Sequence, residues 1–548
     1  MKISLLALRW RAAAAACFVL ASGAAQAAPV LQAGDRVVLY GDSITEQRLY
    51  SRFVQQYIQC RYPELKVKFY NAGWSGDTAG GGFNRLERDV LLLNPTVVTL
   101  FFGMNDGGYR PMDAGITANF KRNEEKIITA LKAKGVRVVV YTPGAVDYDR
   151  QKKLGECNYN DNLESLGKAA LELAQHYELP HADVFHPMVT FQTAQKAKQP
   201  GFTIIPDAVH PNGPGHLMMA QEMLKGLGAE PMPPLGALDL KGGAGDGLRV
   251  VSQQPAQVVL ETTRPMNLPF WFEGGSLAVM RDSGFLAMAS GKLTVKGLAA
   301  GYYKLALNGA DCGKFSADEL AAGVGVAGNT FAPAQRLHDL IQRKEDSYYT
   351  AWRQVRLPLA DIAGSQQIVE GLMAADEGYQ TVIHNLAAPL AKGTFTLTAA
   401  PEGPNLAQGK RYVCSDENKY NWGIGGLTDG RWDATSQHCF ATGDAPNFPK
   451  HVTLDLGQPA RVGTVTLGVP PFGSTKTIKV AISADGQTFS EVGSHQFQLR
   501  KEERATVAFP SATARFVRLI YADRYDEDVN YPRVFAFTTE VEVYATAK

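Results

Sequence analysis

Short apolar runs alternate with amphipathic stretches along residues 30–230. The apolar runs predict strands at 36–40, 67–70, 96–102, 136–141 and 182–185. Apolar residues at helical spacing predict helices from the first strand to about residue 60, and at 83–93, 116–134, 162–177 and 213–226. This alternation predicts a parallel sheet covered by helices on both faces.

The pattern changes at two proline-rich breaks, 231–234 and 400–404, which are typical of linkers. Residues 235–400 predict a β-rich, sandwich-like region with an inserted helix at 333–354. Its expected strands lie at 248–251, 256–262, 268–272, 292–295 and 302–307. Residues 403–548 carry short strands spaced by turns such as Asp429-Gly430, and predict a nearly all-β region.

The N-terminus has the pattern of an export signal. Cations precede a short apolar run at 12–20, and Ala25-Gln26-Ala27 is a small-residue cleavage site. We therefore predict a signal peptide over residues 1–27 and a periplasmic or extracellular location. The run is too short to span a bilayer, so no transmembrane anchor is expected.

The charge balance argues against one class of function. Lys and Arg total 55 against 54 Asp and Glu, a net charge of +1. No basic excess is available to neutralise phosphates, which disfavours a dedicated nucleic-acid binder.

The cysteine count constrains the redox chemistry. Six cysteines are present, and Cys17 falls in the predicted signal. Five then remain, so at least one thiol is unpaired. We expect Cys414 and Cys439 as the first candidates for a disulfide because they fall in one predicted region, although spacing alone leaves the pairing open. No cysteine or histidine spacing indicates a zinc site.

Polar segments follow several strands of the predicted parallel sheet at one edge. Ser43 comes directly after the first strand, where a serine is either a helix cap or a nucleophile. Segments 71–78, 103–106 and 207–211 lie where the same sheet edge is expected. Together they supply the base, the acid and the oxyanion donors that a serine esterase needs.

These four segments, in this order, resemble the SGNH hydrolases, also called the GDSL esterase/lipase family. The resemblance covers residues 30–230 and implies an α/β/α, flavodoxin-like fold. It implies Ser43 as nucleophile, His210 as base and Asp207 as its orienting acid. Gly76 and Asn105, with the N–H of Ser43, match the oxyanion hole. No metal or organic cofactor is implied for acyl transfer.

Several neighbouring residues compete for these roles. We assign the base to His210 because an acid lies three residues before it and a proline follows it. His216 is expected to be structural, Gly80-Gly81-Gly82 to form a flexible loop beside the site, and Asp106 to cap the next segment. The other competing histidines are His176, His181 and His186.

Residues 403–548 resemble discoidin, or coagulation-factor type C, domains, which are galactose-binding-like jelly rolls. Some members hold a structural calcium near positions matching Asp429 and Glu540, but two acids are few for an ion that takes six to eight oxygens. Tyr420 and Trp422 either stack on a sugar or pack their loop. The matching pieces lie at 405–410, 427–432, 452–457, 482–486, 514–518 and 540–544.

An aromatic run at 270–272 in the middle region either lines a sugar site or belongs to the core, and we favour the core. The esterase pattern beside a carbohydrate-type region predicts removal of O-acetyl groups from a polysaccharide or glycan. Two alternatives stay open: a lipase, lysophospholipase or thioesterase, and a non-catalytic glycan-binding surface protein.

Overall fold

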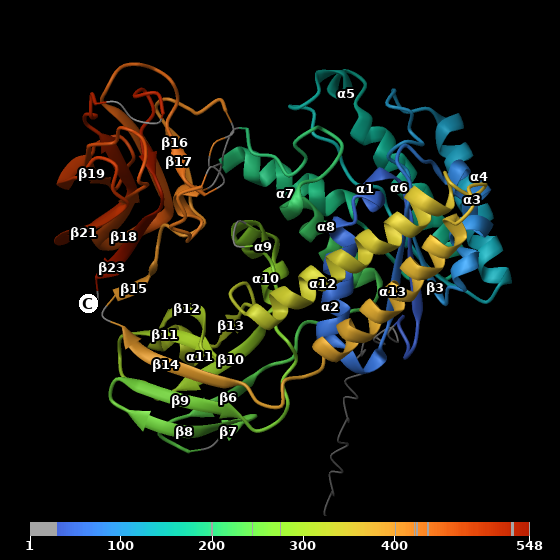
Figure 1. Ribbon diagram of the computed structural model, residues 1–548, viewed down its shortest axis with the longest axis horizontal. Helices are drawn as coiled ribbons and strands as arrows, with labels where there is room; N and C mark the ends of the chain where they lie inside the picture. Colours follow the sequence, from blue (N-terminus) through green and yellow to red (C-terminus); the bar gives the residue numbers. More distant parts are fainter. Residues whose placement is uncertain are drawn as a thin grey trace, which may run out of the picture.

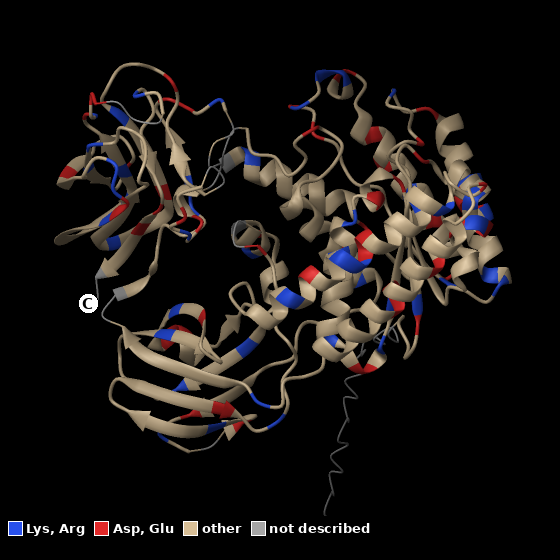
Figure 2. Cartoon of the chain, viewed as in Figure 1, with Lys and Arg blue, Asp and Glu red and all other residues tan. Residues whose placement is uncertain are grey.

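The computed structural model contains three successive parts (Figure 1). It describes residues 30–198, 201–243, 245–273, 276–400, 402–420, 422, 426–435, 438–527 and 531–546. The predicted signal peptide lies outside these residues. Acidic and basic side chains are interspersed along all three parts (Figure 2).

The first part is built on a five-stranded parallel sheet of order β2-β1-β3-β4-β5. This is the flavodoxin-like order, and strand order reverses between β1 and β3, where ligands bind in open α/β sheets. Gly41 at the end of β1 is level with Gly73 of β2 and Phe101 of β3. The strands are β1 Arg36–Gly41, β2 Lys68–Gly73, β3 Val97–Phe101, β4 Arg137–Tyr141 and β5 His181–Ala182.

Helices cover both faces of this sheet because its strands are apolar on both sides. Val37 and Leu39 of β1 pack with α2 and α8, whereas Val38 and Tyr40 pack with α3, α4 and α6. The helices are α1 Ser43–Glu46, α2 Leu49–Arg61, α3 Ala79–Asp89, α4 Ala114–Ala133, α5 Lys152–Glu156, α6 Tyr159–His176, α7 Phe185–Lys198 and α8 Gly213–Gly226. The predicted fold class of this part is confirmed.

The middle part contains two sheets, of order β13-β10-β6-β7 and β12-β11-β14-β9-β8. The strands are β6 Gly236–Asp239, β7 Gly245–Asp246, β8 Leu248–Gln254, β9 Gln257–Thr262, β10 Gly291–Lys296, β11 Tyr302–Leu307, β12 Ala310–Ser316, β13 Val324–Val326 and β14 Thr394–Ala400. Short helices α9 Leu277–Ser283, α10 Phe285–Ala289 and α11 Ala317–Ala322 connect them.

Two long helices inserted between β13 and β14 lie against the first part (Figure 1). They are α12 Ala332–Tyr349, continued by a π-helical turn Thr350–Arg356, and α13 Ser365–Leu386. They cover the edge strand β2 and donate to its carbonyls, which have no strand partner on that side. Lys344 Nζ and Gln380 Nε2 donate to Phe69 O, the latter at 3.4 Å, and His384 Nε2 lies 3.1 Å from Val67 O.

The C-terminal part is a β-sandwich built on a seven-stranded sheet, of order β15-β23-β18-β21-β19-β20 with β16 on β18, beside a two-stranded sheet of β17 and β22. The strands are β15 Glu402–Asn405, β16 Arg411–Cys414, β17 Phe440–Ala441, β18 Lys450–Val469, β19 Thr477–Ser483, β20 Ser490–Gln496, β21 Glu503–Tyr521, β22 Phe537–Thr538 and β23 Val541–Thr546.

Several local expectations were wrong. Residues 268–272 form no strand, although Phe270, Trp271 and Phe272 are buried, so the core alternative is confirmed. The strand expected at 182–185 ends at Ala182, because helix α7, which the pattern did not predict, begins at Phe185. Helix α13 was also not predicted.

The cysteines of the described part are thiols. The expected disulfide does not form: Cys414 Sγ lies 3.1 Å from Asp416 O, and the buried Cys439 lies 3.6 Å from Thr538 O. None of the described helices has the length and apolar character needed to cross a membrane.

Candidate active site

Ser43 lies at the carboxyl end of β1, as the first residue of helix α1. Asp42 caps this helix, because its Oδ1 accepts a hydrogen bond from Ile44 N at 3.0 Å. Burial, with smaller effects from Asp106 and Asp77, raises the pKa of Asp42 to about 7. The strand-to-helix turn therefore presents the Ser43 hydroxyl at the sheet edge and leaves its N–H among the helix donors without an intrahelical acceptor.

The structure brings Ser43, His210 and Asp207 into one hydrogen-bonded chain. His210 Nε2 lies 2.8 Å from Ser43 Oγ, and His210 Nδ1 lies 2.8 Å from Asp207 Oδ2. A neutral ring protonated on Nδ1 satisfies both contacts. Burial alone would raise the pKa of Asp207, but hydrogen bonds from the backbone N–H groups of His210 and Val209 lower it. The aspartate is therefore ionised at neutral pH and orients the ring.

The sequence spacing used to choose His210 does not single it out. Asp183 and Pro187 flank His186 in the same way, and His186 Nδ1 lies 2.6 Å from Asp183 Oδ2. However, the other ring nitrogen of His186 faces Glu164 at 3.5 Å rather than a serine. Geometry, not spacing, distinguishes the two histidines.

His216 is buried on α8 and packs on the ring of Tyr50, as expected for a structural residue. Its Nε2 lies 2.8 Å from Gln47 Oε1. Burial lowers its pKa to about 3, so it stays neutral throughout the ordinary working range of an esterase.

Gly76 lies in the turn after β2, with φ +74°. This left-handed conformation favours glycine, and no protein atom comes within 4 Å of the position that a Cβ would take. Among the described residues, the Gly76 N–H has no hydrogen-bond acceptor. The turn thus offers a free N–H donor at the same sheet edge as Ser43.

Asn105 follows β3 and its amide is fixed from two sides. Its Nδ2 donates to Asp77 O at 2.9 Å, and its Oδ1 accepts from Tyr109 Oη at 3.0 Å. An amide group has two N–H donors, so one remains for a ligand. Asp77 itself is held by the buried Arg85, whose Nε lies 2.6 Å from its carboxylate and whose guanidinium also donates to Gly41 O at 3.0 Å.

Two expectations about neighbouring residues were wrong. Gly80-Gly81-Gly82 is not a loop but the first turn of α3, where a Cβ on Gly82 would stand 2.7 Å from the Phe102 ring. Asp106 does not cap the segment that follows it. It accepts a hydrogen bond at 3.0 Å from Ala79 N, at the start of the earlier helix α3.

Sequence reasoning also missed residues that meet beside this site. Glu46 of α1 accepts hydrogen bonds from Ser75 Oγ, from Tyr349 Oη at 3.1 Å and from Arg353 Nη2 at 3.0 Å. No local signal could have paired Glu46 with Arg353, because 307 residues separate them.

The aromatic residues singled out in the C-terminal part line a cavity of about 440 Å³. Trp422 packs edge-on against Tyr531 and Phe537, whereas Tyr420 is 64% exposed and donates to Asp444 at 3.0 Å. Trp422 is therefore held by packing, and Tyr420 presents the more accessible ring.

Asp429 and Glu540, the residues at the positions of the family's structural calcium, do not fit that ion here. Both Asp429 oxygens accept hydrogen bonds from nitrogen, at 2.8 Å from Arg431 N and 2.7 Å from His438 Nδ1. Glu540 is buried, and burial together with Asp429 raises its pKa to about 10, so it is protonated at neutral pH. Among the described residues, no three acidic, histidine or cysteine side chains gather into a metal site.

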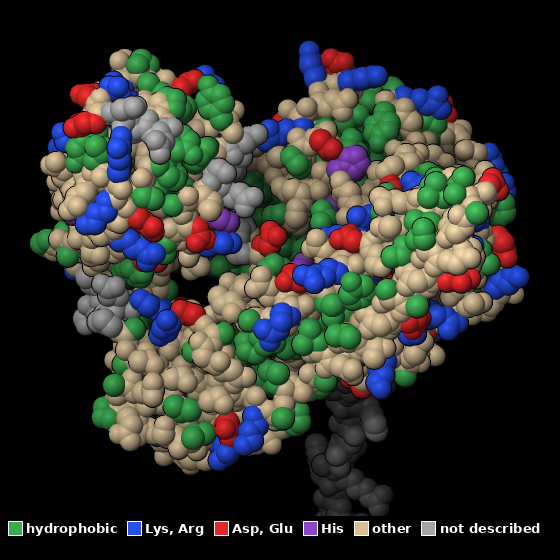
Figure 3. All heavy atoms as spheres, viewed as in Figure 1, with side chains coloured by type: hydrophobic (Ala, Val, Ile, Leu, Met, Phe, Trp, Pro, Cys, Tyr) green, Lys and Arg blue, Asp and Glu red, His purple; other side chains and the backbone are tan. Residues whose placement is uncertain are grey.

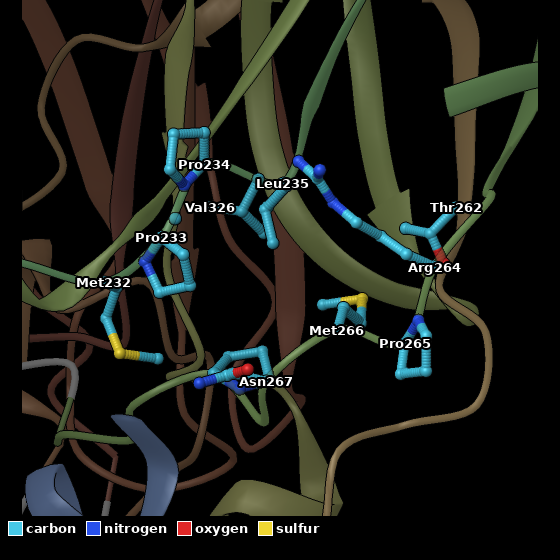
Figure 4. Close-up of a pocket in the computed structure, with 12 residues that line it drawn as sticks. Met232, Pro233, Pro234, Leu235, Thr262, Arg264, Pro265, Met266, Asn267 and Val326 are labelled. Atoms are coloured by element: carbon cyan, nitrogen blue, oxygen red, sulfur yellow. The ribbon is translucent and has the colours of Figure 1, made fainter. Parts of the chain in front are cut away.

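Two further cavities lie at the junctions between the parts. A cavity of about 370 Å³ is lined by the linker at 232–235 and by 262–269, with Arg264 as the one charged side chain among its lining residues (Figure 4). It contains none of the predicted site residues. A larger hollow of about 580 Å³ separates the C-terminal part from the first part (Figure 3). It is lined by α7, by Asn212 just beyond His210, and by Lys410 and Arg411.

Comparisons with known proteins relate the first and last parts of the chain to two families. Residues 39–218 match the GDSL-like Lipase/Acylhydrolase family, and residues 426–519 match the NedA-like, galactose-binding domain. An acetylxylan esterase of Geobacillus stearothermophilus is 22% identical over 219 residues, which cover 36% of this chain and 95% of that protein.

A gut microbial diltiazem-metabolizing enzyme is similar in fold, with a TM-score of 0.55 at 20% identity, over 68% of this chain and 98% of that chain. A lipase/acylhydrolase from Enterococcus faecalis covers 35% of this chain and 95% of its own, with a TM-score of 0.30 and 24% identity. The family match and the esterase relative support a carboxylic ester hydrolase. The chain thus carries a GDSL/SGNH acylhydrolase domain near its N-terminus and a galactose-binding, discoidin-like domain at its C-terminus.

Proposed function

We propose that this protein is an exported serine esterase that removes O-acetyl groups from a polysaccharide or glycan. The observation that carries the catalytic part is the hydrogen-bonded chain from Ser43 through His210 to Asp207, with 2.8 Å at each step. The pattern at residues 1–27 supports export.

The reaction is acyl transfer in two steps. Ser43 Oγ attacks the ester carbonyl while His210 Nε2 takes its proton, and the Asp207 carboxylate stabilises the imidazolium that forms. The N–H groups of Ser43 and Gly76 and the free amide hydrogen of Asn105 hold the negative oxygen. His210 then returns the proton to the leaving alcohol, and water, activated by the same histidine, cleaves the acyl-enzyme.

Two observations support a carbohydrate substrate. The relative of known substrate is called an acetylxylan esterase, and the C-terminal part matches a galactose-binding domain. The hollow between the two parts begins at Asn212, two residues beyond His210, and is large enough for part of a polymer chain.

The test is a series of synthetic esters of increasing acyl length, with wild-type protein and Ser43→Ala. An acetylesterase hydrolyses acetyl esters fastest and loses activity steeply with chain length, and the alanine variant is inactive while remaining folded. A preference for long acyl chains would instead identify a lipase. Near-wild-type turnover by Ser43→Ala would remove Ser43 as the nucleophile.

A further inference from the structure

Glu46 joins the two segments on which the proposed chemistry depends. It is the last residue of α1, the short helix that begins at Ser43. Its carboxylate Oε2 accepts a hydrogen bond from Ser75 Oγ, and Ser75 immediately precedes Gly76. Glu46 is only 8% exposed, so water has little access to replace this contact. One buried carboxylate therefore links the nucleophile's helix to the turn that carries the Gly76 N–H.

The middle part of the chain supplies the groups that hold the other oxygen of Glu46. Tyr349, the last residue of α12, donates to Oε1 at 3.1 Å. Arg353, on the π-helical turn that follows, donates to the same oxygen from Nε at 3.2 Å and from Nη2 at 3.0 Å. Burial alone would raise the pKa of Glu46, but the hydrogen bonds from Ser75 and Arg353 lower it. Glu46 is therefore ionised, and its hydrogen bonds are charge-assisted.

Arg353 holds the same turn by a second contact. Its guanidinium carbon lies 3.4 Å from the centroid of the Trp74 ring, and Trp74 directly precedes Ser75. The neighbouring Trp352 meets Trp74 edge-on, with ring centroids 6.1 Å apart. Arg353 thus holds the turn of residues 74–76 at two points. It contacts the Trp74 ring directly, and it binds Glu46, which accepts the hydrogen bond from Ser75.

We propose that Arg353 and Tyr349 are positioning residues that set the oxyanion donor of Gly76 against Ser43, so that the inserted helices of the middle part belong to the catalytic machinery. The inference rests on the proposed function, because it takes the Gly76 N–H as an oxyanion donor. Neither side chain touches the reacting atoms. Arg353 acts through Glu46 and Trp74, and Tyr349 acts through Glu46. These contacts fix the turn that carries the Gly76 N–H.

The consequence is a defect in the transition state rather than in substrate binding. A displacement of about 1 Å in a catalytic group can cost about 100-fold in rate. We expect Arg353→Met to lower kcat by about 10–100-fold with little change in KM, and Tyr349→Phe to lower kcat by a smaller factor. Arg353→Lys, which keeps the charge but not the two-pronged contact, should restore part of the loss.

The matched control is Arg343→Met, the same substitution at an exposed position of α12. Turnover is expressed per active site, counted by titration with a serine-directed organophosphonate, so that partial unfolding does not count as a loss of kcat. The serine hydroxyl attacks a trifluoromethyl ketone and forms a tetrahedral adduct with a negatively charged oxygen. The inhibition constant Ki of this ketone therefore measures the oxyanion hole independently of turnover. Its Ki should rise in Arg353→Met by the same factor by which kcat/KM falls.

The outcomes separate the two claims. If Ser43→Ala retains turnover, the proposed function fails. If activity depends on Ser43 but Arg353→Met matches Arg343→Met, the proposed function stands and this inference is overturned. A fall in kcat with an unchanged ketone Ki also overturns it, because the defect would then lie outside the oxyanion hole. If Arg353→Met does not fold, the test uses Tyr349→Phe, which removes a single hydroxyl. The same two measurements, kcat per active site and the Ki of the ketone, then decide.

Discussion

Individual side chains at the sheet edge carry the proposed chemistry, and Asn105 gives the sharpest test of a single donor. Asn105→Ala removes the second amide hydrogen, the proposed oxyanion donor, together with the side-chain contacts to Asp77 O and Tyr109 Oη. We expect kcat to fall about 10²–10³-fold with a smaller change in KM, measured on a soluble acetyl ester. A variant that mainly raises KM would show that Asn105 binds the ground state instead.

The two histidines near the nucleophile have opposite expected behaviour. His210 accepts the Ser43 proton in the proposed mechanism, so its removal takes away the general base. His216 is buried and neutral, because burial lowers its pKa to about 3, and it contacts Gln47 rather than Ser43. His210→Gln should therefore cost far more activity than His216→Gln. Equal losses in kcat/KM for the two variants would leave the base unassigned.

Asp42, which caps the helix that begins at Ser43, is expected to make the free energy of unfolding depend on pH. Because burial raises its pKa to about 7, the folded state binds a proton more tightly than the unfolded state. Its contribution is therefore favourable below the unfolded pKa near 4 and is lost as pH rises through about 7. Asp42→Asn keeps the cap to Ile44 N and removes this loss. In urea unfolding from pH 5 to pH 8, the variant should gain stability over wild type as pH rises. A constant difference would show that Asp42 is not buried as an acid.

At the scale of elements, the inserted helices complete the catalytic sheet. Lys344 of α12 is fully buried, donates to Phe69 O of the edge strand and lies 3.7 Å from Glu345 and 3.8 Å from Asp376. Lys344→Met would remove the one cation that pairs with these two buried acids among the described residues, so we expect a loss of about 3–5 kcal/mol in the free energy of unfolding.

Arg343→Met, on the exposed side of the same helix, serves as the control and should change stability by at most about 0.5 kcal/mol. Urea unfolding followed by fluorescence and by loss of activity measures both variants. A Lys344→Met protein as stable as the control would mean that α12 does not support the edge strand.

Local pattern predicted most elements of the first part, although not α5 or α7, because most of its strands are apolar runs and most of its helices have one apolar face. Helix α8, at Gly213–Gly226, was predicted with its observed bounds. The pattern predicted a helix at 333–354, but it could not predict that α12 packs against β2. That contact is decided by tertiary packing and not by the local sequence. Motifs predicted Ser43, Gly76, Asn105, Asp207 and His210 as site residues, but not Glu46 or Arg353, whose partners are distant in sequence.

At the scale of the whole molecule, we expect the three parts to contribute differently to catalysis and to substrate binding. The proposed nucleophile, base, acid and oxyanion donors lie in the first part, and the middle part covers the edge strand of its sheet and supplies the proposed positioning residues. A protein ending near residue 400 should therefore hydrolyse a small acetyl ester about as well as the full chain. On acetylated polymer it should be slower below saturation, because tethering raises local substrate concentration.

Folding of the shortened protein is checked first by circular dichroism, because Arg411 of the C-terminal part contacts Gln195 of α7. If the folded, shortened protein matched the full chain on every polymer that the full chain deacetylates, the C-terminal part would not be a targeting module for the substrate.

The central claim is that Ser43 removes acetyl groups from a polysaccharide. The most direct measurement is acetate release from a panel of acetylated polysaccharides, including xylan and pectin, by the full chain and by Ser43→Ala at equal concentration. We expect the wild-type protein to release acetate from at least one polymer, and Ser43→Ala to release none above background. Absence of release from every polymer by a wild-type protein that cleaves synthetic acetyl esters, or equal release by both proteins, would contradict it.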